Sequence, residues 1–246
     1  MLLNLKKKTI VTLLAVTVFS IAMAFLETAI VVYLRELYFP DGFQFPLKGM
    51  SQQIAATELI REFSTIVMLI GIGFLAGQNA ASRFGYFLLS FAIWDIFYYV
   101  FLYAILGWPV HVMEWDILFL IPILWTGPVI TPVIISLAMI ILGLTMIAHQ
   151  KGPDKRSSVA LLIGVFVVLW AFMKEFAEFH QSVYGGDFSF NAVHILQSGT
   201  QFIPQQFPWL IFAIGCLFIS FGLIHYVFQI RKTNFSHGDT EIHGVV

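Results

Sequence analysis

The sequence is poor in charged residues, in cysteine and in catalytic motifs. Only 11% of its 246 residues are charged, whereas a soluble domain carries about 25%. The single cysteine, Cys216, can form no disulfide within the chain. The 13 basic and 14 acidic residues give a formal net charge of −1, which argues against a nucleic-acid partner. With no Gly-rich phosphate loop and no G-x-S-x-G element, the sequence points to no enzyme class and leaves open whether the protein is an enzyme.

What the chain has in abundance is apolar side chains. They make up 59% of the residues, so the solvent around the protein must be lipid. In lipid, every backbone polar group must be paired within the protein, which leaves helices or a closed barrel. The apolar runs are continuous and do not alternate with a period of two, so helices are favoured. The sequence therefore predicts an all-α, polytopic integral membrane protein.

Six apolar segments predict six transmembrane helices. Together they form a single domain of residues 1–232, and the polar residues 233–246 are expected to be a flexible cytoplasmic tail. The helices are expected at residues 9–34, 55–77, 84–106, 117–148, 157–179 and 207–230.

The first segment resembles a signal peptide but is long enough to remain in the protein. It follows Lys6–Lys8, and Ala22-Met23-Ala24 matches a small-x-small cleavage pattern. The apolar run nevertheless continues for 26 residues, to Leu34. We therefore expect the first helix to stay uncleaved.

The fourth segment, residues 117–148, is too long for one straight crossing. Its 32 residues would make about 48 Å of helix, against about 30 Å of hydrocarbon. Pro128 and Pro132 each remove a backbone donor within it. The sequence therefore predicts one crossing whose helix is kinked, or broken after a short half-helix, near Gly127–Pro132.

The distribution of basic residues predicts the orientation. Lysines and arginines gather at alternate ends of the segments, and the connection 107–116 contains none. By the positive-inside rule, both termini are expected in the cytoplasm of a multi-pass protein of the cell (plasma) membrane. The basic residues behind this expectation are Lys6–Lys8, Arg83, Lys151, Lys155, Arg156, Arg231 and Lys232.

In this orientation, ionisable side chains gather in the outer half of the membrane. Asp95 lies 12 residues after Arg83, about 18 Å along the helix and slightly beyond the midplane. The apolar stretches 63–76 and 159–173 are too short to cross the core alone. Their helices must therefore take in the neighbouring charged turns, which contain Glu58, Arg61 and Glu62 before the second helix and Lys174 and Glu175 after the fifth.

We expect these side chains to form one polar site walled by helices 1, 2, 3 and 5. A charge near the bilayer centre costs about 2.5–3.5 kcal/mol, so such groups usually face the bundle interior and pair. Because acids outnumber bases, either some carboxylates are protonated or a cation fills the gap. The candidate ligand-binding residues are Glu27, Glu58, Arg61, Glu62, Asp95, Asp116, Lys174 and Glu175.

Two cofactors can be considered. Two histidines near inner helix ends, His149 and His225, could ligate haem, but such residues more often serve only as interface histidines. Carboxylates and a histidine could hold a divalent metal, although no HxxxH, HExxH or ExxH spacing supports it. The candidate metal ligands are Glu58, Glu62, Asp95, Glu178 and His180.

Structural explanations compete with these functional ones. Asp95 could hydrogen-bond to a serine, threonine or tryptophan of a neighbouring helix and only fix the packing there. The Glu58–Arg61–Glu62 group could be a solvated helix start, since acids favour the first turn of a helix.

Three functions are consistent with the sequence. The first is binding of a small polar or amphiphilic ligand, such as a lipid or quinone head group or a cation, with catalysis left open. The second is a non-catalytic subunit whose charges pair with another membrane protein or with a second copy. A transporter is less favoured, because the chain has no internal repeat and the inner half of its helices is nearly free of charge.

Overall fold

The computed structural model describes residues 7–184 and 192–242. Six of its helices are long and apolar enough to cross a membrane, which confirms the predicted all-α class and the six membrane-spanning helices. These six are α1 (Lys7–Tyr38), α2 (Gln52–Ala76), α3 (Ala80–Leu106), α4 (Ile130–His149), α5 (Lys155–Tyr184) and α7 (Trp209–Ile242). The other elements are the short helix α6 (Ala192–Gly199) and the strands β1 (Trp115–Phe119) and β2 (Trp125–Pro128).

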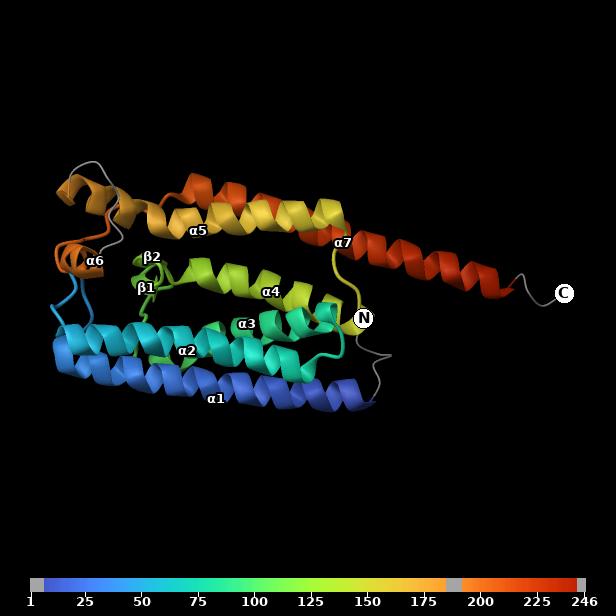
Figure 1. Cartoon of the computed structure of the whole chain (residues 1–246), viewed down its shortest axis with the longest axis horizontal. Helices are drawn as coiled ribbons and strands as arrows, with labels where there is room; N and C mark the ends of the chain where they lie inside the picture. Colours follow the sequence, from blue (N-terminus) through green and yellow to red (C-terminus); the bar gives the residue numbers. More distant parts are fainter. Residues whose placement is uncertain (1–6, 185–191, 243–246) are drawn as a thin grey trace.

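The six long helices run along one common direction (Figure 1). α3 packs against α1, α2 and α4, whereas α5 packs mainly against α7. The connections α1–α2, α3–α4 and α5–α7 share one end of the bundle, together with β1, β2 and α6. We call this the loop end. The opposite end, where residues 77–79 and 150–154 make short connections, is called the short-turn end.

Helix α3 runs through the middle of this arrangement and has well-defined ends. Asn79 and Ser82 form a capping box, in which each side chain accepts a hydrogen bond from the backbone of the other. At the opposite end, Gly107 adopts a left-handed conformation with φ 65°, which a residue with a side chain rarely adopts. These caps fix the ends of α3 at Ala80 and Leu106 and so position the aspartate in its middle turns.

Glycines bring the helix pairs into close contact. A Cβ atom added at Gly85 of α3 would lie 2.8 Å from the carbonyl oxygen of Gly143 of α4. A Cβ atom at Gly164 of α5 would lie 2.8 Å from the carbonyl oxygen of Gly215 of α7. Small residues at such contacts are common where helices pack within a membrane.

The prediction of a helix over residues 117–148 is only partly correct. The helix begins at Ile130, and the preceding residues form the antiparallel hairpin β1–β2 in place of the expected half-helix. Strand pairing joins the backbone groups of this hairpin, and Asp116 and Thr126 are buried in it. Pro128 ends β2, and Pro132 lies in the first turn of α4, where a missing N–H costs no helical hydrogen bond.

Helix α7 extends further toward the C-terminus than the sequence predicted. Residues 233–242, expected to belong to a loose tail, continue α7. Residues 243–246 lie outside the described part of the chain. The flexibility of this tail stays a prediction.

Candidate functional site

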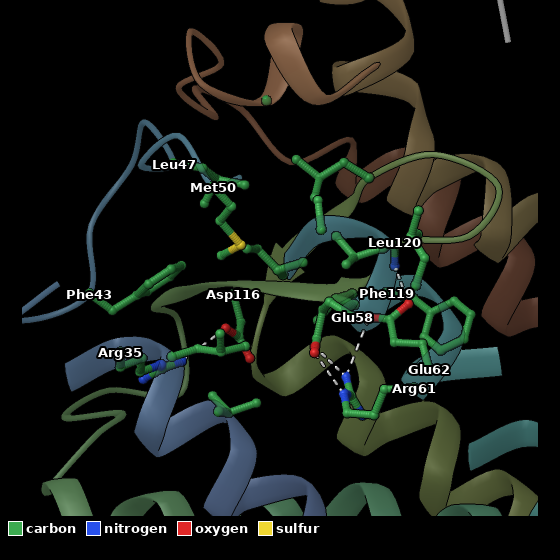
Figure 2. A pocket seen from close by; sticks show the side chains of 18 of the residues that line it. Arg35, Phe43, Leu47, Met50, Glu58, Arg61, Glu62, Asp116, Phe119 and Leu120 are labelled. Carbon is green, nitrogen blue, oxygen red and sulfur yellow. Dashed lines mark hydrogen bonds and ion pairs between the residues drawn. The ribbon is translucent and has the colours of Figure 1, made fainter. Parts of the chain in front are cut away.

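A cavity of about 490 Å³ lies at the loop end (Figure 2). α1, α2 and α3 line it, together with the 39–50 segment, the β1–β2 hairpin and α6. Most lining residues are apolar, among them Val31, Leu34, Leu59, Ile117 and Leu124. The charged residues of the lining are Glu27, Arg35, Lys48, Glu58, Arg61, Glu62, Asp95 and Asp116. The structure thus brings six of the eight candidate residues to one place.

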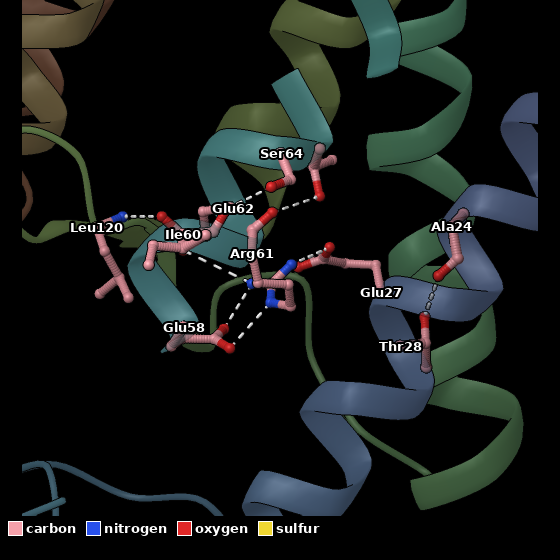
Figure 3. Close-up of polar contacts among 10 residues, drawn as sticks. Ala24, Glu27, Thr28, Glu58, Ile60, Arg61, Glu62, Ser64 and Leu120 are labelled. Atoms are coloured by element: carbon pink, nitrogen blue, oxygen red, sulfur yellow. Dashed lines mark hydrogen bonds and ion pairs between the residues drawn. The ribbon is translucent and has the colours of Figure 1, made fainter. Parts of the chain in front are cut away.

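Arg61 of α2 is the centre of one ion cluster (Figure 3). Its Nε and Nη2 atoms lie 2.9 and 2.5 Å from the two carboxylate oxygens of Glu58, one turn earlier in the same helix. Its Nη1 atom contacts the carboxylate of Glu27 of α1, and one oxygen of Glu62 lies 3.9 Å from Nη2. Bidentate guanidinium–carboxylate pairs are among the stronger charge-assisted contacts, so this cluster ties α1 to α2.

Glu62 connects the same cluster to the hairpin. Its side chain is buried, and its Oε2 atom accepts a hydrogen bond of 2.9 Å from the backbone N–H of Leu120. Leu120 follows β1 in the turn of the hairpin, where a buried N–H without a partner would cost about 1–3 kcal/mol. The contact therefore holds the hairpin turn against α2.

A second ion pair joins α1 to the hairpin. Arg35 Nη2, in the last turn of α1, lies 3.2 Å from Asp116 Oδ1 in β1. The Arg35 guanidinium also lies over the rings of Trp108 and Phe43, 3.9 and 4.6 Å from their centroids. Desolvated cation–π contacts of this kind contribute about 2 kcal/mol. Figure 2 shows this pair on the opposite side of the view from Glu58 and Arg61.

Asp116 lies outside the membrane-spanning helices and is only 2% exposed. Burial raises the pKa of its carboxyl to about 6, although Arg35, the Ile117 N–H and the Tyr99 hydroxyl each act to lower it. Its Oδ2 atom meets no hydrogen-bond donor at normal geometry within the described residues. The group is therefore ionised at neutral pH and takes up a proton in mild acid.

Asp95 of α3 lines the cavity and is half-buried. The hydroxyl of Ser136 in α4 donates a hydrogen bond of 2.8 Å to Asp95 Oδ2. This is the packing contact that the structural explanation expected, but it occupies only one of the two carboxylate oxygens. Within the described part of the chain, no donor hydrogen-bonds to Oδ1, which leaves this atom available to a bound molecule.

Two neighbours of Asp95 on α3 also have unused polar atoms. Trp94 and Tyr98 both line the cavity. Trp94 Nε1 is buried with no hydrogen-bond partner, and the Tyr98 hydroxyl forms no hydrogen bond within the described residues. The Tyr98 phenol lies close enough to both ion groups to interact with the charges of Asp116, Arg35, Glu27 and Arg61.

Lys174 and Glu175 lie apart from this cavity, which corrects the expectation that helix 5 forms one of its walls. Lys174 Nζ pairs with Glu178 at 2.6 Å on α5. Glu175 Oε1 accepts hydrogen bonds of 2.5 and 3.0 Å from the backbone N–H groups of Gln205 and Gln206. These residues line a separate cavity of about 260 Å³. α5 is drawn away from α1 and α2 because its main partner is α7.

The candidate metal ligands are divided between the same two places. Glu58, Glu62 and Asp95 line the larger cavity, whereas Glu178 and His180 belong to α5. Across residues 7–184 and 192–242, no group of three or more His, Cys, Asp and Glu side chains could hold a metal ion. The divalent-metal hypothesis therefore gains no support from this arrangement.

The candidate histidine ligands contact serine hydroxyls. His180 Nδ1 lies 2.7 Å from Ser198 Oγ, and His225 Nδ1 lies 2.9 Å from Ser157 Oγ. These contacts join α5 to α6 and α5 to α7. The contact of His225 matches the interface role that the sequence allowed for His149 and His225.

Several cavity-lining residues were not among the sequence candidates. Arg35, Tyr98 and Lys48 all line the cavity. Arg35 follows Glu27 by eight residues, which places both on one face of α1, and this spacing could have revealed it. Tyr98 gives no comparable signal, because an aromatic residue in an aromatic-rich helix is ordinarily a packing residue.

Comparison of the chain with protein-family models, curated proteins and solved structures finds no match in any of the three. The chemistry of the site therefore has to be argued from its own residues.

The raised pKa of Asp116 predicts a pH-dependent stability. Because the folded-state pKa of about 6 exceeds the unfolded value of about 3.9, the stabilising contribution is complete below about pH 4 and is lost as the pH rises through 6. We expect the thermal stability of the wild type in detergent to fall by up to about 3 kcal/mol from this source between pH 4 and pH 7. Asp116→Asn should remove this component.

Melting temperatures measured across this pH range test the prediction. Asp41→Asn changes an exposed acid at the same end of the bundle, and this variant should keep the wild-type pH dependence. If wild type and Asp116→Asn differ by the same amount at every pH, the assignment of this titration to Asp116 is wrong.

Proposed function

We propose that the loop-end cavity binds the polar head group of an amphiphilic molecule drawn from the membrane. The observation that carries this proposal is the combination, in one cavity of about 490 Å³, of buried ionic groups and a mostly apolar lining. Clefts of roughly 300–1,000 Å³ with apolar walls and a few convergent polar groups are the usual form of small-molecule sites. A lipid or quinone head group with part of its tail matches that lining.

The cover of the cavity supports the same proposal. Phe45 and Leu47, from the α1–α2 connection, pack against the core formed by Phe176 and Phe202. Leu47 and Met50 lie over the ionic groups in Figure 2. A cover made of connecting segments keeps bulk water from the charges and strengthens every electrostatic contact inside.

Filling the cavity tests whether it is the binding site. Leu59 lines the cavity from α2, so Leu59→Trp should place an indole in it. We expect the purified wild type to bind at least one member of a panel of phosphatidylethanolamine, phosphatidylglycerol, phosphatidylcholine and a short-chain ubiquinone. Native mass spectrometry should show at least tenfold weaker binding by Leu59→Trp.

The adjacent residue supplies the matched control. Ile60 is 66% exposed and does not line the cavity, so Ile60→Trp adds the same side chain on the outside of α2 and should bind as the wild type does. Equal binding by Leu59→Trp and the wild type would show that the cavity is not the site. Failure of the wild type to bind any of the four molecules would contradict the proposed function itself.

We also propose that the loop end lies outside a plasma membrane and that both termini are cytoplasmic. At the loop end, Arg35 and Arg61 are paired with carboxylates, and Lys174 is paired with Glu178. The short-turn end holds Lys151 and several other basic residues within or beside its connections. Among the residues that the structure describes, the basic side chains at that end form no ion pair with Asp or Glu apart from His225 with Asp154, and this excess supports a cytoplasmic placement.

Cysteine labelling tests this orientation. Gly49 at the loop end and Gly152 at the short-turn end have open space around an added Cβ atom, so each should tolerate a cysteine. In a Cys216→Ser background, a membrane-impermeant maleimide should label Gly49→Cys in intact cells and Gly152→Cys only after lysis. The reverse pattern would overturn the proposed orientation.

A second candidate function is membership of a larger membrane complex. The pair Lys174–Glu178 lies outside the main cavity, and Glu178 has a side chain that is 59% exposed. We propose that this exposed pair contacts another membrane protein or a second copy. Loss of a copurifying chain in Glu178→Gln, with lipid binding unchanged, would favour this function.

A further inference from the structure

The polar atoms that remain unused in the cavity indicate what its ligand must offer. Within the described residues, Asp95 Oδ1 accepts no hydrogen bond, and the Tyr98 hydroxyl forms none. Asp95 has an accessible part and lines the cavity beside Tyr98. While Asp95 is ionised its oxygens can only accept, so a molecule that completes the bonding of Oδ1 must bring an N–H or O–H group.

The guanidinium groups of the cavity, by contrast, are already paired with carboxylates. Arg61 donates hydrogen bonds from Nε and Nη2 to Glu58, and its Nη1 atom contacts Glu27. Arg35 is held between Asp116 and two aromatic rings. An anionic head group at either guanidinium would also meet the carboxylates already paired with it, and their like charge disfavours such a ligand.

The total charge of the lining also favours a ligand with hydrogen-bond donors. Five carboxylates and three basic residues line the cavity, an excess of two acids. One of the three bases, Lys48, is exposed in the 39–50 segment, so the deeper part of the lining is more acidic still. A head group that brings N–H or O–H donors meets this excess of carboxylates favourably.

We propose that the ligand is a lipid whose head group carries hydrogen-bond donors, hydroxyl or ammonium, and that Asp95 Oδ1 accepts from that head group. This inference rests on the proposed function and names the chemical class of its ligand. Ser136 acts as a positioning residue, because its hydroxyl holds Oδ2 of Asp95 and so fixes this carboxylate in the wall of the cavity.

Three lipids with identical acyl chains test the proposal. Phosphatidylethanolamine carries an ammonium donor and phosphatidylglycerol carries hydroxyl donors, whereas the phosphatidylcholine head group carries no donor. Binding to the purified full-length protein is measured by native mass spectrometry. We expect at least one of the two donor lipids to bind tenfold or more tightly than phosphatidylcholine, as the loss of a hydrogen bond to a charged group predicts. Preference for the first identifies the ammonium, and preference for the second identifies the hydroxyl.

Substitutions then assign the preference to Asp95. Asp95→Asn should remove most of the preference for donor lipids while leaving phosphatidylcholine binding unchanged. Asp41→Asn, at an exposed acid of the same end, should keep the wild-type preference. The comparison of lipids on the wild type needs no variant, so it stands even if Asp95→Asn fails to fold.

The possible failures are distinguishable. If Leu59→Trp abolishes binding of all three lipids but the wild type binds them equally, the donor proposal is overturned while the cavity remains the binding site. A preference that survives in a folded Asp95→Asn variant also overturns the role of Asp95. If Leu59→Trp changes no binding, the proposed function fails, and this inference fails with it.

Discussion

The arrangement of the loop end depends on how one arginine is neutralised inside an apolar bundle. Arg61 cannot lose its charge, so the surrounding chain must supply carboxylates at short range. Glu58 supplies two oxygens from the same helix, and Glu27 supplies another contact from α1. Removing one partner of such a buried group leaves an uncompensated charge at a cost of about 3–5 kcal/mol. This requirement brings α1 and α2 together at the depth where the cavity forms.

The same requirement explains why a hairpin can lie beside these helices. A strand pair inside a membrane protein must have every backbone group satisfied, and its turn is the weakest place. Glu62 accepts the N–H of Leu120 in that turn, and Arg35 neutralises Asp116 in β1. The charges that hold the hairpin also line the cavity, so the stability of this end and the polarity of the site come from the same side chains.

Much of this structure could be predicted from the sequence, and the failures have identifiable causes. Composition and segment length predicted the six helices, because lipid leaves a chain few alternatives. The short apolar stretch of the second helix predicted that Glu58, Arg61 and Glu62 lie within the bundle. In the structure all three line the cavity. Residues 117–129 were expected to be helical because an apolar run gives no period that separates helix from strand. Lys174 was grouped wrongly because depth along a helix says nothing about which helices are neighbours.

The central claim is that Arg61 and its carboxylates form one compensated unit, and a double-mutant cycle tests it most directly. The stabilities of Glu27→Gln, Arg61→Gln and the double variant would be measured by thermal unfolding in detergent. The account predicts strong non-additivity: Arg61→Gln alone should be severely destabilised, by about 3 kcal/mol or more, and adding Glu27→Gln should restore part of the loss. Additive effects, with the double variant as unstable as the sum of the two single variants, would contradict the account.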